Sequence, residues 1–425
     1  MVLHYQNNVF SDLIQKYPSW EELRKFLESE DGGLFRIADT KVESNLCLIR
    51  YEKGTTKMDL PHSKWFRSVV WNTKFNCPIC VSPSKTTTDE FSFNTLKDIS
   101  DAGIICQELH DGFMINCFRM LDDENLHITS RSKLDAAGKF YSEKSFRELF
   151  LEAYNENGRI NIRNPDSSNN EVAVFKSFLV QHKEHRIVTP ISCNKIYTIH
   201  VGVVYKDGSV SFEDSPETLN DGTELNTIPI EVKAIKGSYA QIAARAVDTD
   251  EMNEVQKWIK NQLVERDWQF QGLVFKDTHG NRWRFRSEKY SAVKSLRGNS
   301  PNARDRFSQL YSQNLLHKYM EYYPEDLLAM TVHMMFIQAI IKMLYDNYVD
   351  LHITKVKKVD EIDKMYLPHL YSIHGLYLSQ LRPTGKKVNI NEITLYLHKQ
   401  PWQRVSFLIK KVVDGINVEP VGVSV

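Results

Sequence analysis

The sequence predicts an α+β protein with mostly antiparallel sheets, followed by a helical C-terminal domain. Two observations predict this class. Between residues 60 and 290, short runs of β-branched and aromatic residues alternate with turn signals, as in antiparallel strands. Residues 303–380 instead carry longer stretches of leucine, methionine and tyrosine with helical spacing. The chain has 425 residues, which is enough for two or three domains.

The first 59 residues predict a small α/β extension of the central domain. Residues 10–30 have helical periodicity, Ser19 suits a helix start, and Asp31-Gly32-Gly33 suits a helix end. Alternating apolar residues then predict strands at 34–37 and 46–51.

The central domain, predicted over residues 60–298, reads as short strands with two interposed helices. An Asp-Gly pair at Asp207 and Gly208 predicts a hairpin turn. Strands are expected at 66–71, 78–81, 113–118, 126–129 and 196–205, helices at 145–154 and 252–266, and a hairpin at 272–276 and 282–286.

A third, helical domain is predicted over residues 299–425. The stretch from Leu296 to Asn302 contains glycine, serine and proline and marks a turn or linker. Pro324-Glu325-Asp326 is typical of a helix start, and residues 391–413 predict at least one further helix. Methionine and aromatic residues in this domain are expected to form its core.

Composition limits the classes of function. The chain contains 54 basic and 54 acidic residues, so its net charge implies no broad attraction to nucleic acid, although a local basic patch is compatible with it. The Cys77-x-x-Cys80 pair has no second pair at zinc spacing, and we expect isolated thiols in a reducing compartment.

The N-terminus carries no signal-peptide pattern. The most apolar run, residues 327–344, includes His333, Gln338 and Lys342. This run therefore predicts a buried helix and not a membrane span, so we expect a protein that is neither secreted nor transmembrane.

The stretch Glu108 to Ile115 is the most informative motif. Asp111 and Gly112 precede an apolar strand, as in the Lys-x-Asp-Gly motif of covalent nucleotidyltransferases. In those enzymes the lysine amine attacks the α-phosphate of ATP, and that chemistry needs a nitrogen nucleophile. The corresponding residue here is Leu109, which has none.

Further segments in the same order make residues 60–290 resemble the phage-type ATP-dependent RNA ligase family, including similar proteins of large DNA viruses. The resemblance implies a nucleotidyltransferase fold for the central domain. The matching segments are Phe66 to Trp71, Ser82-Pro83-Ser84-Lys85, Thr129 to Phe140, Glu184 to Val188, Gln271 to Phe275 and Arg284-Phe285-Arg286.

The resemblance implies which residues would bind nucleotide or phosphate, and which are lost. The acidic residue that binds ribose aligns with Leu179, near Gln181, and the glutamate that supports metal and phosphate chemistry aligns with Gln271. The residues implied to bind nucleotide or phosphate are Lys85, Asp111, Gly112, Arg284 and Arg286.

These departures remove the groups needed for nucleotide attachment and metal binding, but they leave positively charged side chains in place. Leucine forms no phosphoramidate, and a neutral amide is a poorer Mg²⁺ ligand than a carboxylate. Arg284 and Arg286 still grip anions. We therefore expect no catalytic residue at Leu109, Leu179 or Gln271, no metal site and no cofactor. ATP and Mg²⁺ are expected only if activity is retained.

Other residues near the motif have plainer interpretations. His110 would point to the opposite strand face from Leu109, so it is a poor replacement nucleophile. Lys133 is expected at a strand edge on the surface, and Glu108 in a solvent-facing or turn-stabilising role. His182 and His185 are expected in a polar turn.

The leading hypothesis is a catalytically inactive RNA-ligase-like protein of viral origin. It would bind a nucleotide or the end of a nucleic acid, or act as a virion or assembly scaffold. The alternative is an active RNA ligase or nucleotidyltransferase with a relocated nucleophile. Expected partners are RNA or DNA ends or viral proteins, without a membrane. The expected location is the cytoplasm or the virion.

Overall fold

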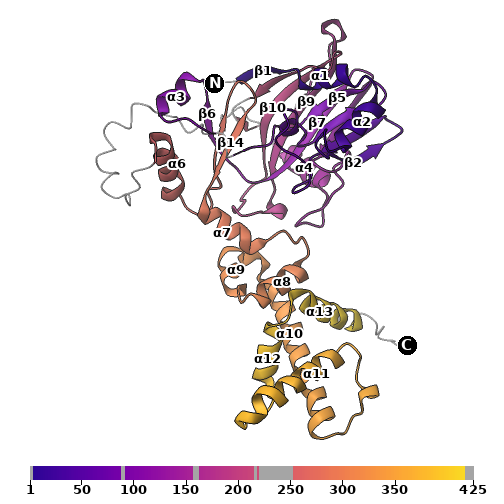
Figure 1. The fold of residues 1–425 in the computed structure, drawn as a ribbon, viewed down its shortest axis with the longest axis vertical. Helices are drawn as coiled ribbons and strands as arrows, with labels where there is room; N and C mark the ends of the chain where they lie inside the picture. Colours follow the sequence, from indigo (N-terminus) through magenta and orange to yellow (C-terminus); the bar gives the residue numbers. More distant parts are fainter. Residues whose placement is uncertain (1–2, 88–90, 157–161, 215–217, 220–251, 417–425) are drawn as a thin grey trace. The chain divides into compact units, whose positions relative to one another are not determined.

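The computed structural model describes residues 3–87, 91–156, 162–214, 218–219 and 252–416 (Figure 1). It divides into two compact units, Met1–Ser291 and Ala292–Val425. The first unit contains antiparallel sheets and the described part of the second is helical, so the predicted α+β class is confirmed.

Unit 1 contains three antiparallel sheets. Sheet A has the order β1-β11-β10-β9-β7-β8, and β12 also pairs with β10; sheet B is β2-β3-β4-β5, and sheet C is β14-β13-β6. The strands of sheet A are β1 (Leu3–Asn7), β7 (Phe113–Met120), β8 (Asp123–Ser130), β9 (Glu171–Gln181), β10 (Lys195–Tyr205), β11 (Val210–Asp214) and β12 (Thr218–Leu219). Those of sheets B and C are β2 (Arg36–Lys41), β3 (Leu46–Arg50), β4 (Val69–Asn72), β5 (Cys77–Val81), β6 (Ile105–Glu108), β13 (Gly272–Lys276) and β14 (Arg282–Arg286).

Two helices of unit 1, α2 and α6, begin at side-chain caps close to the starts that the sequence predicted. Ser19 caps α2 by accepting from the backbone N–H of Glu22, whose carboxylate accepts in return from the Ser19 backbone. Asn253 caps α6 in the same way. The helices are α1 (Val9–Lys16), α2 (Trp20–Glu28), α3 (Leu96–Asp101), α4 (Phe146–Glu156) and α6 (Glu254–Glu265).

The sheets and helices of unit 1 pack into three hydrophobic cores. One face of sheet A packs with sheet B, α1 and α2 around Phe66, Trp71 and Phe175. The opposite face of sheet A packs against α4, whose predicted stripe includes the buried Leu149 and Phe150. Sheet C packs one face against α3 and α6 in a third core. The other face of sheet C is free to carry polar side chains.

The regular elements in the described part of unit 2 are helices joined by turns and irregular segments. Asn302 caps α8 by accepting from the backbone N–H groups of Arg304 and Asp305. Helix α13 packs against α8 and α10, and α12 packs against α10. The helices are α8 (Ala303–Ser312), α9 (Leu316–Tyr322), α10 (Leu327–Tyr348), α11 (Leu367–Leu376), α12 (Ile390–His398) and α13 (Trp402–Ile416). Helix α7 (Glu288–Arg297) spans the division between the units.

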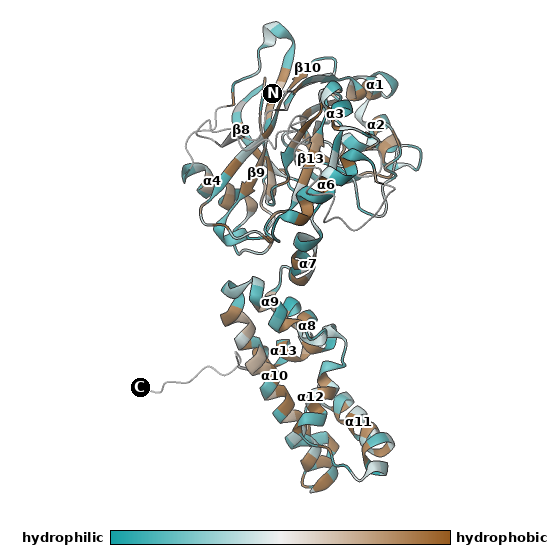
Figure 2. Cartoon of the chain, turned by 90° about the vertical axis from the view of Figure 1, so that its left-hand side faces the viewer, coloured by the Kyte–Doolittle hydropathy of each residue, from teal (hydrophilic) through white to brown (hydrophobic). Residues whose placement is uncertain are grey.

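The prediction of a buried helix at residues 327–344 is wrong. Only 28% of the most apolar window of the helical stretch Pro324–Ile353 is buried, and Leu328 is 77% exposed. One stripe of α10, including Ile337 and Leu344, packs on its neighbours, while apolar residues elsewhere on the helix stay open (Figure 2). By length and composition alone this stretch meets the requirements of a membrane-crossing helix. The polar residues within this helical stretch argue against a membrane span.

Candidate anion-binding site

Sheet C separates aromatic from basic side chains. On β14, Trp283 and Phe285 point into the core with α3 and α6. Because successive side chains of a strand point to opposite faces, Arg282, Arg284 and Arg286 share the other face. The strand sequence Arg-Trp-Arg-Phe-Arg thus builds a row of guanidinium groups on a packed aromatic base.

Basic residues from all three sheets meet this row around the ring of Tyr51. Tyr51 directly follows β3, and its backbone N–H donates to the carbonyl of Phe66. The guanidinium carbon of Arg131, just after β8, lies 4.6 Å from the centre of the Tyr51 ring. The amine of Lys85, after β5, lies 5.6 Å from the same centre. We call Lys85, Arg67, Arg131, Arg282, Arg284 and Arg286 the Tyr51 cluster.

The cations of the Tyr51 cluster act on one another. Burial, followed by the charge of Arg282, lowers the pKa of Arg67 to about 10. Burial and then Arg286 lower the pKa of Arg284. These lowered pKa values mean that burial, and after it the neighbouring like charges, make the charged forms of the two arginines less favourable. At neutral pH they remain protonated, so the site carries a concentrated positive charge.

No carboxylate within the described residues neutralises this charge by an ion pair with a cluster member. Buried guanidinium nitrogens of Arg131, Arg282 and Arg286 have no hydrogen-bond partner among the described residues. Unpaired buried donors cost free energy, and an anion bound among them would recover it. This arrangement suits a ligand with several negatively charged oxygens.

A buried carboxamide, that of Gln107, lies on the same face of sheet C as the basic residues. Gln107 on β6 pairs with Val274, which pairs with Arg284, so all three side chains lie on the basic face of sheet C. Gln107 is only 3% exposed, and neither its Oε1 nor its Nε2 has a hydrogen-bond partner among the described residues. The Oε1 of buried Gln271 is also unpaired there. An amide supplies an acceptor as well as donors, so the site offers more than positive charge.

Leu109 continues β6 opposite Gly272 and donates its backbone N–H to the Gly272 carbonyl at 2.8 Å. Gly272 pairs in turn with Arg286, so Leu109 stands in the same row as that arginine. The sheet register therefore places Leu109 at the edge of the basic face. An apolar side chain there offers no atom for covalent attachment of a nucleotide.

Asp111 holds the neighbouring loop in place. Its Oδ2 accepts from the backbone N–H groups of Val188 and Thr189, both at 3.0 Å, and from the Tyr290 hydroxyl at 3.3 Å. Its buried Oδ1 has no partner among the described residues. The carboxylate thus ties the 188–189 segment to α7, and only one oxygen is left for a ligand.

Gly112 is required by a close approach to β9. A Cβ atom at this position would lie 2.6 Å from the Val180 carbonyl oxygen and 3.1 Å from two side-chain carbons of Leu179. Leu179 therefore packs beside Gly112. Gln181 donates to the Asp111 carbonyl at 2.9 Å, so it supports this segment from within the protein.

The remaining residues near the motif have structural contacts. His110 stacks on Tyr197, with ring centres 5.2 Å apart. Glu108 forms an ion pair with Arg266, and the exposed Lys133 lies 3.7 Å from an Asp39 carboxylate oxygen.

Groups suited to metal binding are not clustered in the part of the chain that the structure describes. No three histidine, cysteine or acidic residues there gather into a metal site. His182 and His185 flank a 3₁₀ turn, Lys183–His185. Cys77 and Cys80 are buried and not disulfide-bonded, and burial raises the pKa of both thiols, that of Cys77 to about 12.

The structure brings together some of the residues that the sequence singled out. Lys85, Arg284 and Arg286 belong to one cluster, whereas Asp111 and Gly112 are engaged with the 179–189 region. Sequence analysis missed Tyr51, Arg67, Arg131 and Arg282 as site residues. All four lie in segments that the sequence analysis had already named, and the alternation of Arg with aromatic residues on β14 was the available signal for Arg282.

Comparisons with known proteins found similarity among solved structures only. No family model matches the sequence, and no curated protein matches it. Among solved structures, the chain is similar to an archaeal ATP-dependent RNA ligase, with 10% sequence identity and a TM-score of 0.28. The similarity covers 96% of this chain and 99% of the ligase. The chemistry of the Tyr51 cluster therefore carries the functional argument.

Proposed function

We propose that unit 1 is a non-catalytic, RNA-ligase-like module that binds the phosphate groups of a nucleotide or of a nucleic-acid end. The observation that carries this proposal is the Tyr51 cluster, whose guanidinium groups from three sheets lack carboxylate partners within the described residues. Guanidinium groups bind phosphate oxygens in a bidentate fork, and several of them together match a terminal phosphate.

The residues at the motif support binding without nucleotidyl transfer. Leu109 offers no nucleophile, and Gln271 presents a neutral amide where a carboxylate would assist a metal ion. Arginine does not deprotonate at ordinary pH, so it serves as an anion clamp and not as a general acid. The site retains the groups that hold phosphate and lacks those that react with it.

The test is equilibrium binding of short fluorescent RNA and DNA carrying a 5′-phosphate, a 5′-triphosphate or a 5′-hydroxyl, with ATP and inorganic tripolyphosphate as competitors. We expect affinity to rise with the number of terminal phosphates and to fall with salt, because phosphate binding releases counterions. Arg284→Ala with Arg286→Ala should weaken binding, at about 1.5–3 kcal/mol for each lost charged contact.

The matched control is Arg24→Ala on α2, because Arg24 is exposed and pairs only with Glu28 on the same helix. It removes an equal charge away from the cluster and should leave binding unchanged. If the parent protein fails to bind at low salt, or the double variant binds as well as the parent, the proposal is wrong. Competition by ATP but not by tripolyphosphate would identify the nucleotide as the ligand and exclude simple phosphate binding.

A further inference from the structure

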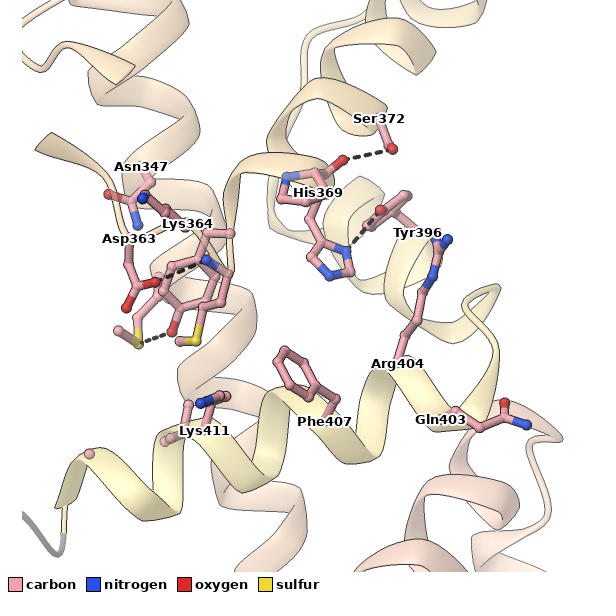
Figure 3. A pocket seen from close by; sticks show the side chains of 16 residues that line it. Asn347, Asp363, Lys364, His369, Ser372, Tyr396, Gln403, Arg404, Phe407 and Lys411 are labelled. Atoms are coloured by element: carbon pink, nitrogen blue, oxygen red, sulfur yellow. Dashed lines mark hydrogen bonds between the residues drawn. The ribbon is translucent and has the colours of Figure 1, made fainter. Parts of the chain in front are cut away.

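A large groove in unit 2 is lined mainly by apolar, basic and neutral polar side chains, with one carboxylate, that of Asp363. Its volume is about 1530 Å³, and α13 forms one wall (Figure 3). Small-molecule sites usually enclose roughly 300–1000 Å³, so this groove has room for a larger occupant. The opposite wall comes from α10, α11, α12 and residues 363–366.

Helix α13 presents one face to the protein and another to the groove. Val405, Leu408 and Ile409 are fully buried against unit 2. Arg404 and Phe407 line the groove at a spacing of three residues, which places them on one helix face. Lys411, four residues further, continues the same face. Figure 3 shows the side chains of Arg404 and Phe407 rising from α13 on the side where His369 lies, with Lys411 further along the same helix.

Charge and apolar surface alternate along this face. Phe407 is 50% exposed and lies between Arg404 and Lys411. Seven residues of helix span about 10.5 Å, so the two cations stand two turns apart. Neither they nor Lys364 across the groove has a carboxylate ion-pair partner among the described residues. The one carboxylate among the residues that line the groove, that of Asp363, accepts from the backbone N–H of Met365 at 2.9 Å and forms no ion pair with these cations.

The far wall is held in shape by its own hydrogen bonds. His369 Nδ1 lies 2.9 Å from the Tyr396 hydroxyl, which joins α11 to α12. The Tyr366 hydroxyl donates to the sulfur of Met343 on α10 at 3.2 Å. Met343 is 41% exposed and offers a polarisable apolar surface that adapts to varied side chains. A preformed wall lowers the entropic cost of binding.

We propose that this groove binds an acidic amphipathic helix of a partner protein. Such a helix would lie along α13 and place two carboxylates, seven residues apart, against Arg404 and Lys411. Aliphatic side chains between the carboxylates would pack on Phe407 and Met343. This is the helix-in-groove mode of recognition, with the charge pattern setting its register.

The probe is a display library of helical peptides with glutamates fixed seven residues apart. The positions between the glutamates vary among leucine, isoleucine, methionine and phenylalanine. Selected peptides are labelled, and their affinity for the full chain is measured by fluorescence anisotropy. We expect Arg404→Glu with Lys411→Glu to weaken binding at least tenfold. Lys410→Glu is the matched control, because Lys410 is exposed on α13 but does not line the groove, and it should change affinity less than twofold.

A charge swap separates recognition from misfolding. Peptides with lysine in place of both glutamates should bind the Arg404→Glu, Lys411→Glu variant and not the parent. Failure to select any groove-dependent peptide, or failure of the charge swap, would overturn the proposal. It would also be overturned if the same variants lost binding of single-stranded oligouridine, or if they dissociated a dimer of the parent. Those results would assign the groove to a nucleic acid or to a second copy of the chain.

Discussion

The guanidinium group of Arg131 lies over the ring of Tyr51, at 4.6 Å from its centre. The aromatic face carries partial negative charge and attracts the cation, which fixes the guanidinium without neutralising it. Tyr51 therefore positions positive charge and leaves the guanidinium nitrogens available to an anion.

Two substitutions of Tyr51 should distinguish the contribution of its aromatic ring to anion binding from that of its hydroxyl group. Tyr51→Leu removes the aromatic face and should weaken binding of tripolyphosphate by about 0.5–2 kcal/mol, because Arg131 and Lys85 lose their cation–π anchor. Tyr51→Phe keeps the ring and should bind nearly as well as the parent. Isothermal titration calorimetry provides the measurement. Equal losses in the two variants would show that the hydroxyl, and not the ring, supports the site.

Asp111→Ala should destabilise unit 1 by about 2–5 kcal/mol, because the backbone N–H groups of Val188 and Thr189 lose their acceptor in a buried setting. Asp111→Asn retains one oxygen and should lose less. Urea unfolding followed by fluorescence measures both variants. If Asp111→Ala leaves the free energy of unfolding unchanged but weakens phosphate binding, Asp111 acts on the ligand and not on the loop.

The stability of unit 1 should depend on Glu171 at acid pH. Buried Glu171 accepts from Arg163 at 2.8 Å, and this hydrogen bond lowers the pKa of the carboxyl below its usual value of 4.5. A lowered folded-state pKa contributes stability above the unfolded pKa, and that stability is lost as pH falls through the folded value. Glu171→Gln should therefore lower the free energy of unfolding at pH 7 by about 1–3 kcal/mol.

The same variant should lose less stability than the parent between pH 5 and about pH 3, which urea unfolding across pH would detect. Glu30→Gln provides the comparison, because Glu30 is 81% exposed and pairs with a surface lysine. It should follow the parent at every pH. Parallel pH profiles for Glu171→Gln and the parent would contradict the assigned role of this ion pair.

Restoring a lysine should not restore nucleotide attachment. Leu109→Lys supplies an amine, but Gln271 is a neutral amide and a poorer metal ligand than a carboxylate, and Leu179 offers no polar atom to a nucleotide. After incubation with α-labelled ATP and Mn²⁺, neither this variant nor the parent should show a labelled band on a denaturing gel. An acid-labile band in the parent that disappears in His110→Ala would instead support a relocated nucleophile.

Local sequence signals predicted elements whose causes are local. The caps of α2 and α6 follow from short polar patterns, and the β13–β14 hairpin from alternation around a turn. The shared face of Arg284 and Arg286 follows from strand periodicity alone. The exposure of α10 could not be predicted from the sequence. Hydropathy shows that a helix is apolar, but it does not show how much of its surface packs against other elements.

The missed members of the cluster needed tertiary information. A single arginine such as Arg67 or Arg131 is usually a solvated surface residue, and only the meeting of three sheets makes these two neighbours. The predicted domain limits, viral source and absence of catalysis remain predictions. A phosphate-binding role for Asp111 and Gly112 also remains one, although both are engaged with the protein itself.

The Tyr51 cluster is assembled from chain positions that are far apart, between residue 51 and residue 286. Its like charges therefore repel one another only when the sheets dock, late in folding, and contacts between such distant positions form slowly. A multivalent anion would relieve this repulsion during the docking step. Phosphate-rich solutions should therefore accelerate refolding of the chain, and its cognate ligand would act as a template for its own binding site.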